Sequence, residues 1–424
     1  MSKLFYSFVF IYSLFGFKLN LVESWGRIRP DDFLAVILGC LAVHQLLTNK
    51  LARVSRALIV FFVFILWSCL SVFYNFFVGR IELISGLLFA LRHLEYSFYA
   101  YLGYMLAKSN FNFRRWICLY LIYSSILVVG QFLGVIGGVT SFSFNRAIAN
   151  TGGPWELALL AAFMCLYFLE YKAFVWAAAS FLLLVFTQSR VTIVALVVVF
   201  LGLYLRIFFR NILNSARRFS FVFLSALALC FVFVIGTFSF SSSSDGVLSR
   251  FEQALDSGTM DVIKSIVSNS TAVKTSADYR DMTYGDAVDE FSQADGDVSA
   301  YIRFNRWATL IKSSLGSLDS AVFGLGPSFA GFAVDGNFVR LLIEVGLIGF
   351  ILYISFLFIL YRSVDDRLLR GYLLVLVLSS IFIDALVTHK AMLLFWVFYG
   401  KYLHQVKIGR DSESLRNSEL IKIS

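Results

Sequence analysis

Apolar stretches of about 20 residues recur along almost the whole chain, and one long polar segment interrupts them between Phe238 and Gly349. A helix of that length spans the hydrocarbon core of a bilayer. Hydrophobic residues make up 59% of the 424 residues, and the mean hydropathy is +0.79. Soluble globular domains are less apolar, at roughly half. The sequence therefore predicts an all-α, polytopic integral membrane protein.

The apolar stretches predict about twelve transmembrane helices. Only four residues, Thr187 to Arg190, separate the long apolar runs of the seventh and eighth spans. We expect helices one to nine in residues 1–238, a large loop with amphipathic helices in 239–337, helices ten to twelve in 338–404 and a tail in 405–424. The predicted spans are 4–22, 33–47, 57–78, 83–107, 116–138, 154–169, 173–188, 191–209, 219–238, 338–361, 370–388 and 391–404.

The basic residues set the predicted orientation. The net charge of +9 could suggest a nucleic-acid partner, but lysine and arginine fall between the apolar spans and form no single basic face. Lysine and arginine are enriched in cytoplasmic loops. With both termini in the cytoplasm, every basic cluster falls on that side, and the large loop is periplasmic in a Gram-negative cell. The clusters are Lys50, Arg53 and Arg56; Lys108, Arg114 and Arg115; Arg206, Arg210, Arg217 and Arg218; and Arg362, Arg367 and Arg370.

Cysteine and histidine give no sign of a metal or cofactor. All five cysteines lie in apolar spans, and the four histidines are widely separated, without the spacing of a ligand motif. We therefore expect no disulfide, no cofactor and no cysteine or histidine metal site. Carboxylates alone could still hold magnesium.

Two segments of the polar loop have helical patterns. Residues 246–266 can form an amphipathic helix, and 298–315 form a stronger candidate with Asp297 as a plausible N-cap. Tyr301 and Trp307 belong to its expected apolar face.

Glycines mark two places where the backbone can come close to another group. The turn Phe323–Pro327 contains two glycines, which permit unusual backbone angles and the close approach of a ligand. Gly346 and Gly349 form a small-residue patch suited to close helix contact.

Four arginines lie beside the membrane spans on the predicted external side: Arg146, Arg190, Arg303 and Arg340. A guanidinium group binds phosphate through two parallel hydrogen bonds and stays charged, so several together could hold a diphosphate without a metal. The alternative is that each arginine contacts lipid headgroups or a nearby carboxylate.

Other polar residues allow both a structural and a functional interpretation. Asp335 and Asn337 could cap the helix that begins near residue 338, or Asp335 could orient or deprotonate a sugar hydroxyl. Arg92 and Glu95 lie inside a predicted span, where charges face the protein interior and pair. They form either a structural pair or one wall of a substrate cavity.

Two further charged groups favour structural explanations. Asp384, His389 and Lys390 suggest a charged cluster at the edge of the loop between the last two spans. Arg340 and Glu344, four residues apart, suggest an ion pair along one helix.

Several segments together resemble the O-antigen polymerases and ligases. The signature begins with a polar pair and an aromatic residue and continues through an apolar helix to Glu-x-Gly-Leu-Ile-Gly. The segments that carry the resemblance are Asp335 to Gly349, Arg146 to Ala158, Thr187 to Arg190, Arg303 with Trp307, and Phe323 to Gly326.

This resemblance implies a GT-C-like glycosyltransferase of the bacterial inner membrane that acts on undecaprenyl-diphosphate-linked oligosaccharides in lipopolysaccharide or related synthesis. It implies membrane lipid as surroundings and a chain-length regulator as a candidate partner, with no nucleic acid. The expected catalytic residues are Asp335, Arg303 and Arg190; the expected diphosphate ligands are Arg146, Arg190, Arg303 and Arg340; and the expected cavity residues are Arg92, Glu95 and Asn337.

The ligases usually carry histidine where this chain has Asp335, which favours a polymerase and leaves the general base open. The alternatives are the ligase itself, a polysaccharide flippase or other transporter, and a non-catalytic assembly scaffold. A transporter would show paired halves with interrupted, charged spans.

Overall fold

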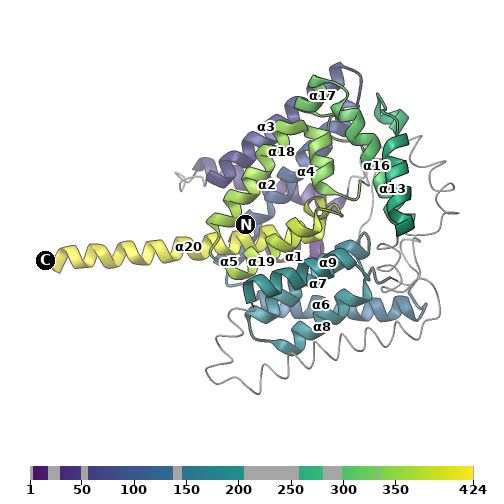
Figure 1. Ribbon diagram of the computed structural model, residues 1–424. Helices are drawn as coiled ribbons and strands as arrows, with labels where there is room; N and C mark the ends of the chain where they lie inside the picture. The colour runs from purple at the N-terminus through teal and green to yellow at the C-terminus, as the bar shows by residue number, and fades with distance from the viewer. Residues whose placement is uncertain are drawn as a thin grey trace.

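A computed structural model describes residues 3–17, 29–48, 56–136, 146–204, 257–279, 298–331 and 334–423 (Figure 1). Within these ranges every regular element is helical, which confirms the predicted all-α class. The predicted span 219–238 and the proposed N-cap Asp297 lie outside them. The α-helices are α1 Lys3–Phe15, α2 Pro30–Thr48, α3 Arg56–Phe77, α4 Leu83–Ser97, α5 Tyr99–Lys108, α6 Phe113–Phe132, α7 Pro154–Glu170, α8 Phe174–Phe186, α9 Arg190–Val199, α13 Ser257–Asn269, α16 Val298–Leu315, α17 Leu318–Phe323, α18 Asn337–Ser363, α19 Arg367–Ser379 and α20 His389–Ile423.

Three helices of the described ranges are long and apolar enough to cross a bilayer, namely α3, α6 and α18. Three shorter apolar helices are Lys3–Phe15, Phe174–Phe186 and Arg190–Leu203. Leu66 on α3 and Phe358 on α18 are 65% and 59% exposed, so these helices present large apolar side chains on their outer faces. Apolar outer faces are stable in lipid and costly in water, in agreement with a membrane location.

Two predicted spans are divided into separate elements in the structure. The stretch 83–107 is divided at Phe98 into α4 and α5. The stretch 370–388 is wrong as one helix, because α19 ends at Ser379 and only a short 3₁₀ turn, Ala385–Val387, follows. The reason is that the Ser380 carbonyl accepts a hydrogen bond from the backbone N–H of Asn337, at 2.9 Å, and not from a residue further along α19. In the loop, α16 has the predicted bounds. Helix α13 overlaps the second part of the predicted helix 246–266, whose residues 246–256 lie outside the described ranges.

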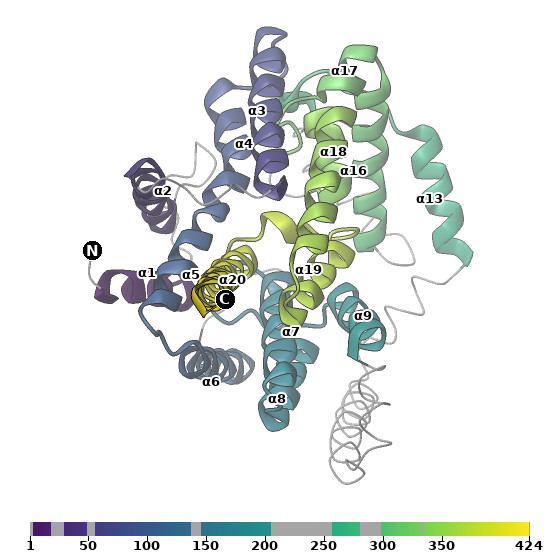
Figure 2. The same cartoon turned by 90° about the vertical axis from the view of Figure 1, so that its left-hand side faces the viewer.

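The first turns of α20 run through the centre of the bundle. Figure 2 shows this helix end-on, with α5, α7 and α19 around it. Its residues from Ala391 to Tyr399 are each at most 4% exposed. Gly103 of α5 and Gly400 of α20 let the two backbones touch, since a Cβ atom on either would overlap the carbonyl of the facing helix. The head of α20 is thereby fixed among elements from both halves of the chain.

Helix α18 is interrupted at Gly346, whose φ of 69° and ψ of −177° are open essentially to glycine alone. The carbonyls before the break find donors elsewhere. Leu325 N donates to Ile343 O at 2.7 Å, and Gly326 N donates to Glu344 O at 3.0 Å. Trp67 Nε1 donates to Val345 O at 2.9 Å. The predicted glycine turn therefore approaches this helix closely.

Replacing Gly346 by alanine should destabilise the protein by about 1–3 kcal/mol, because the backbone angles exclude a side chain. A Cβ atom there would also overlap the Val322 carbonyl oxygen. Thermal unfolding of the purified protein in detergent measures the effect. The control is Gly409→Ala on α20, where a Cβ atom meets nothing within 4 Å and alanine is a good helix former. Equal melting temperatures for Gly346→Ala and wild type would contradict this account of the break.

Candidate functional site

The described residues enclose a cavity of about 390 Å³ between α3, α4, α18 and the segments 149–155 and 384–389. Charged side chains from four parts of the chain line it: Arg29, Arg92, Arg340, Glu344 and Asp384. Aromatic side chains form further wall: Phe17, Phe64, Phe89, Tyr96 and Trp155. Concave sites with aromatic walls and a few convergent polar groups are typical of ligand binding. This cavity is therefore the candidate site.

Arg340 joins α18 to the segment before α20. Its Nη2 lies 2.9 Å from Asp384 Oδ2, and its Nη1 donates to Gly331 O at 2.9 Å. Nη1 also lies 3.5 Å from Glu344 Oε1, which confirms the predicted pair along the helix. The side chain is only 4% exposed, and two carboxylates offset its charge. The guanidinium is therefore held in one position in the cavity wall.

The start of α18 corrects the prediction that Asp335 or Asn337 caps this helix. Gly336 is the N-cap residue, and no side chain caps the helix in that position. The backbone N–H of Asn337 donates to the Ser380 carbonyl instead. The Asn337 side chain is fully buried in the cavity wall, and neither its Nδ2 nor its Oδ1 has a hydrogen-bond partner among the described residues.

Asp335 and Arg303 lie near each other outside the cavity lining. Asp335 has a positive φ of 56° just before α18. Burial raises the pKa of its carboxyl above the usual range, and the Arg303 guanidinium on α16 opposes that shift. Trp307, one turn after Arg303, donates to Val334 O at 2.9 Å and so holds α16 against this segment. Two of the three predicted catalytic residues, Asp335 and Arg303, thus lie together next to the cavity and not in its wall, whereas Arg190 lies at the start of α9.

The remaining predicted residues divide between two places. Arg92 lines the cavity with its guanidinium 5.0 Å from the centre of the Phe89 ring. Glu95, one turn further along α4, lies beside Arg29. Arg146 donates from Nε to Thr187 O at 3.1 Å, in the α8–α9 turn where Arg190 begins the next helix. Of the four predicted diphosphate ligands, only Arg340 belongs to the cavity lining.

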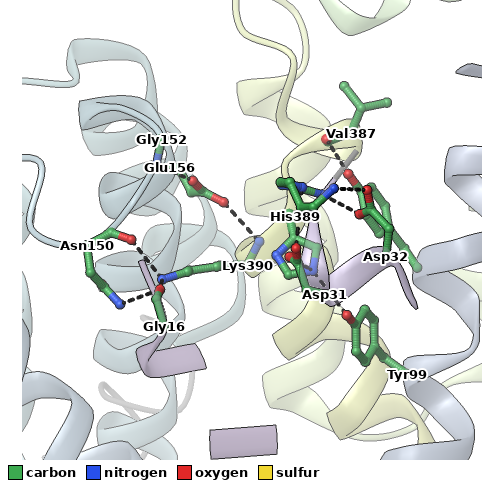
Figure 3. A network of polar contacts seen from close by, with 12 residues as sticks. Gly16, Asp31, Asp32, Tyr99, Asn150, Gly152, Glu156, Val387, His389 and Lys390 are labelled. Carbon is green, nitrogen blue, oxygen red and sulfur yellow. Dashed lines mark hydrogen bonds and ion pairs between the residues drawn. The ribbon is translucent and has the colours of Figure 1, made fainter. Parts of the chain in front are cut away.

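The prediction of a loop-edge cluster at Asp384, His389 and Lys390 is wrong, since His389 and Lys390 are 1% and 2% exposed. Figure 3 shows Lys390 at the centre of a polar network. Its Nζ donates to Gly16 O at 2.7 Å and to Asn150 O at 2.8 Å. Its backbone amide donates to the fully buried Glu156 at 2.9 Å.

His389 extends this network to the N-terminal part of the chain. Its Nε2 lies 2.9 Å from Asp31 Oδ2 and 3.1 Å from the Tyr99 hydroxyl (Figure 3). Asp31 and Asp32 in turn hold Arg29, with Arg29 Nη2 3.1 Å from Asp32 Oδ1. These contacts place Arg29 and His389 in the cavity wall.

Sequence reasoning did not single out Arg29, Glu156 or Asn150, and it misplaced His389 and Lys390. A usable signal existed in the apolar surroundings of these charges. Charged residues within apolar spans normally face the protein interior, as was argued for Arg92. The same rule applied to residues 384–390 favours burial.

A scan against models of known protein families finds no match, and a search of curated proteins finds no similar sequence. Among the described residues, no group of three or more histidine, cysteine, aspartate or glutamate side chains could hold a metal ion. The functional interpretation therefore depends on the residues of the cavity and on the sequence pattern.

Replacing Lys390 by methionine should cost about 3 kcal/mol of folding stability, because two buried carbonyls lose a charged donor next to Glu156. Thermal or denaturant unfolding in detergent measures the loss. Lys264→Met is the matched control, because Lys264 and its partner Asp261 are both 78% exposed, and exposed pairs contribute little. If both variants unfold like wild type, the network does not stabilise the bundle.

Proposed function

We propose that this chain is a glycosyltransferase that polymerises undecaprenyl-diphosphate-linked oligosaccharide repeat units into O-antigen or a related surface polysaccharide. In this proposal the chain has a GT-C-like fold and crosses the inner membrane about twelve times. Both termini lie in the cytoplasm, and the loop 239–337 lies in the periplasm. Polymerisation takes place at the periplasmic face, without a metal ion.

The observation that supports this proposal most is the cavity, which combines three arginines with aromatic walls. Arginine suits phosphate binding, and aromatic faces suit the apolar faces of sugar rings and polyprenyl chains. Residues from the polymerase-like segments contribute to this lining, among them Asn150, Trp155 and Asn337. Segments far apart in the sequence thus supply the groups that a lipid-linked sugar requires.

In the proposed reaction a hydroxyl of the acceptor sugar attacks the anomeric carbon of the donor, and the bond to the diphosphate breaks. Negative charge grows on the leaving diphosphate, and fixed guanidinium groups stabilise it. Arg92 is our first candidate for this role, because it lies in the cavity wall. Asp335 and Arg303 would act on the acceptor glycan from the adjacent loop.

A transporter of lipid-linked saccharide is the second candidate, favoured by the interruption of α18 at Gly346. Transporters often bind their substrates at interrupted helices near the middle of the membrane. Arg340 and Glu344 lie just before this interruption, as buried charges do in such sites. The two functions differ in whether a new glycosidic bond is made.

The deciding assay uses purified protein in detergent with a synthetic undecaprenyl-diphosphate repeat unit and EDTA, and follows glycan ladders on gels. We expect wild type to produce ladders, and Arg92→Gln to lower the rate about 100-fold, as the loss of a transition-state donor does. Arg303→Ala and Arg190→Ala should also lose activity. Arg115→Gln, at an exposed arginine of α6, is the control.

Every variant is first checked by its melting temperature. Ladders of normal length from folded Arg92→Gln would exclude this arginine from catalysis. A wild-type protein that makes no ladder, but carries the lipid-linked unit across liposome membranes, would instead establish the transporter.

A further inference from the structure

One face of the first turns of α18 forms part of the cavity wall. Asn337, Arg340, Leu341 and Glu344 follow the spacing of three and four residues that aligns side chains along a helix. The three polar members are between 0% and 6% exposed. We name Asn337, Arg340 and Glu344 the polar face of α18.

Four atoms of this polar face have no hydrogen-bond partner among the described residues. They are Asn337 Nδ2, Asn337 Oδ1, Arg340 Nε and Glu344 Oε1. Glu344 Oε1 has only the 3.5 Å ion pair with Arg340. Buried polar groups are nearly always hydrogen-bonded, because leaving one unsatisfied is costly. A cluster of such atoms along one cavity wall is therefore an observation that points to a ligand.

Two other buried asparagines show that the chain satisfies this side chain where its role is structural. Asn75 of α3 donates to Ser71 O at 2.9 Å and accepts from Arg80 Nη1 at 3.0 Å. Asn150 donates to Phe15 O at 2.9 Å and accepts from the Tyr120 hydroxyl at 3.0 Å. Asn337 is as buried as these two and lacks both kinds of contact.

We propose that the polar face of α18 binds the hydroxyl groups of a sugar ring. Its unsatisfied atoms include two donors and two acceptors, and hydroxyl groups serve both. A phosphate accepts hydrogen bonds and would be repelled by Glu344, whereas an ammonium group only donates. The aromatic walls suit the apolar faces of the ring, and about 390 Å³ lies within the range of small-molecule sites.

The sugar site deepens the proposed function, on which it rests only for the source of the sugar. In that function the ring belongs to the lipid-linked saccharide, and Arg92 takes the attached phosphate. Hydrogen bonding to the ring itself requires only the polar face of α18.

The test compares Asn337→Leu with Asn75→Leu. Leucine is close to asparagine in size and removes both polar atoms. Because Asn337 has no partner to lose, Asn337→Leu should melt at or above the wild-type temperature. Asn75→Leu should melt several degrees lower, since it removes the acceptor of Arg80 Nη1 and the donor to the Ser71 carbonyl. A drop for Asn337→Leu as large as that for Asn75→Leu would show that Asn337 is structural, and would overturn the proposal.

Sugar binding is measured on the same proteins by saturation-transfer NMR with a panel of methyl glycosides. These probes carry no phosphate or lipid. Wild type should transfer saturation to at least one glycoside, and Asn337→Leu should bind that glycoside at least tenfold more weakly. If wild type transfers saturation to none of the glycosides, or if both proteins bind with equal affinity, the sugar site is overturned.

The two proposals fail separately. If wild type binds a glycoside but forms no ladder, the sugar site is supported and the polymerase is contradicted. If wild type forms ladders but binds no glycoside, the polymerase is supported and the sugar site is contradicted.

Discussion

Inside a bilayer every backbone carbonyl that loses its helical partner must find another donor, because no water competes for it. Helix α18 meets this requirement at its break. Leu325 and Gly326 donate to its free carbonyls, and Trp67 adds a side-chain donor from α3. Since Gly324 and Gly346 touch backbone to backbone, the turn at residues 323–327, α3 and α18 form one unit at this point. The contacts with the turn at 323–327 and with α3 therefore hold the polar face of α18 in place.

Buried charges fix the opposite part of the cavity. Lys390 and His389 stand at the head of α20 and contact the end of α1, the start of α2 and the start of α7. Each such group is costly to bury alone, and it persists because hydrogen bonds and opposite charges surround it. The result is that segments separated by more than 300 residues, such as Gly16 and Lys390, meet at one place.

Local patterns predicted local structure well. Continuous apolar stretches predicted α3 and α7 close to their bounds, and an amphipathic pattern predicted α16. The spacing of Arg340 and Glu344 predicted their ion pair. Long-range contacts were beyond such reasoning. The 370–388 stretch is apolar enough for a helix, yet the Ser380 carbonyl is used to satisfy the start of α18. Asparagine is a favoured N-cap residue, but the Asn337 side chain does not cap α18, and the Ser380 carbonyl accepts from the Asn337 backbone N–H.

The charges around the cavity set how strongly it attracts a diphosphate in our proposal. Glu344 and Asp384 already offset Arg340, and Asp31 and Asp32 offset Arg29. An incoming anion gains least from arginines that are neutralised in this way. In our proposal the diphosphate is bound by Arg92, which lies in the cavity wall against the Phe89 ring. Phosphate and sugar then have separate tasks. In the proposed reaction, negative charge grows on the phosphate, while hydrogen bonds to the polar face of α18 position the sugar ring.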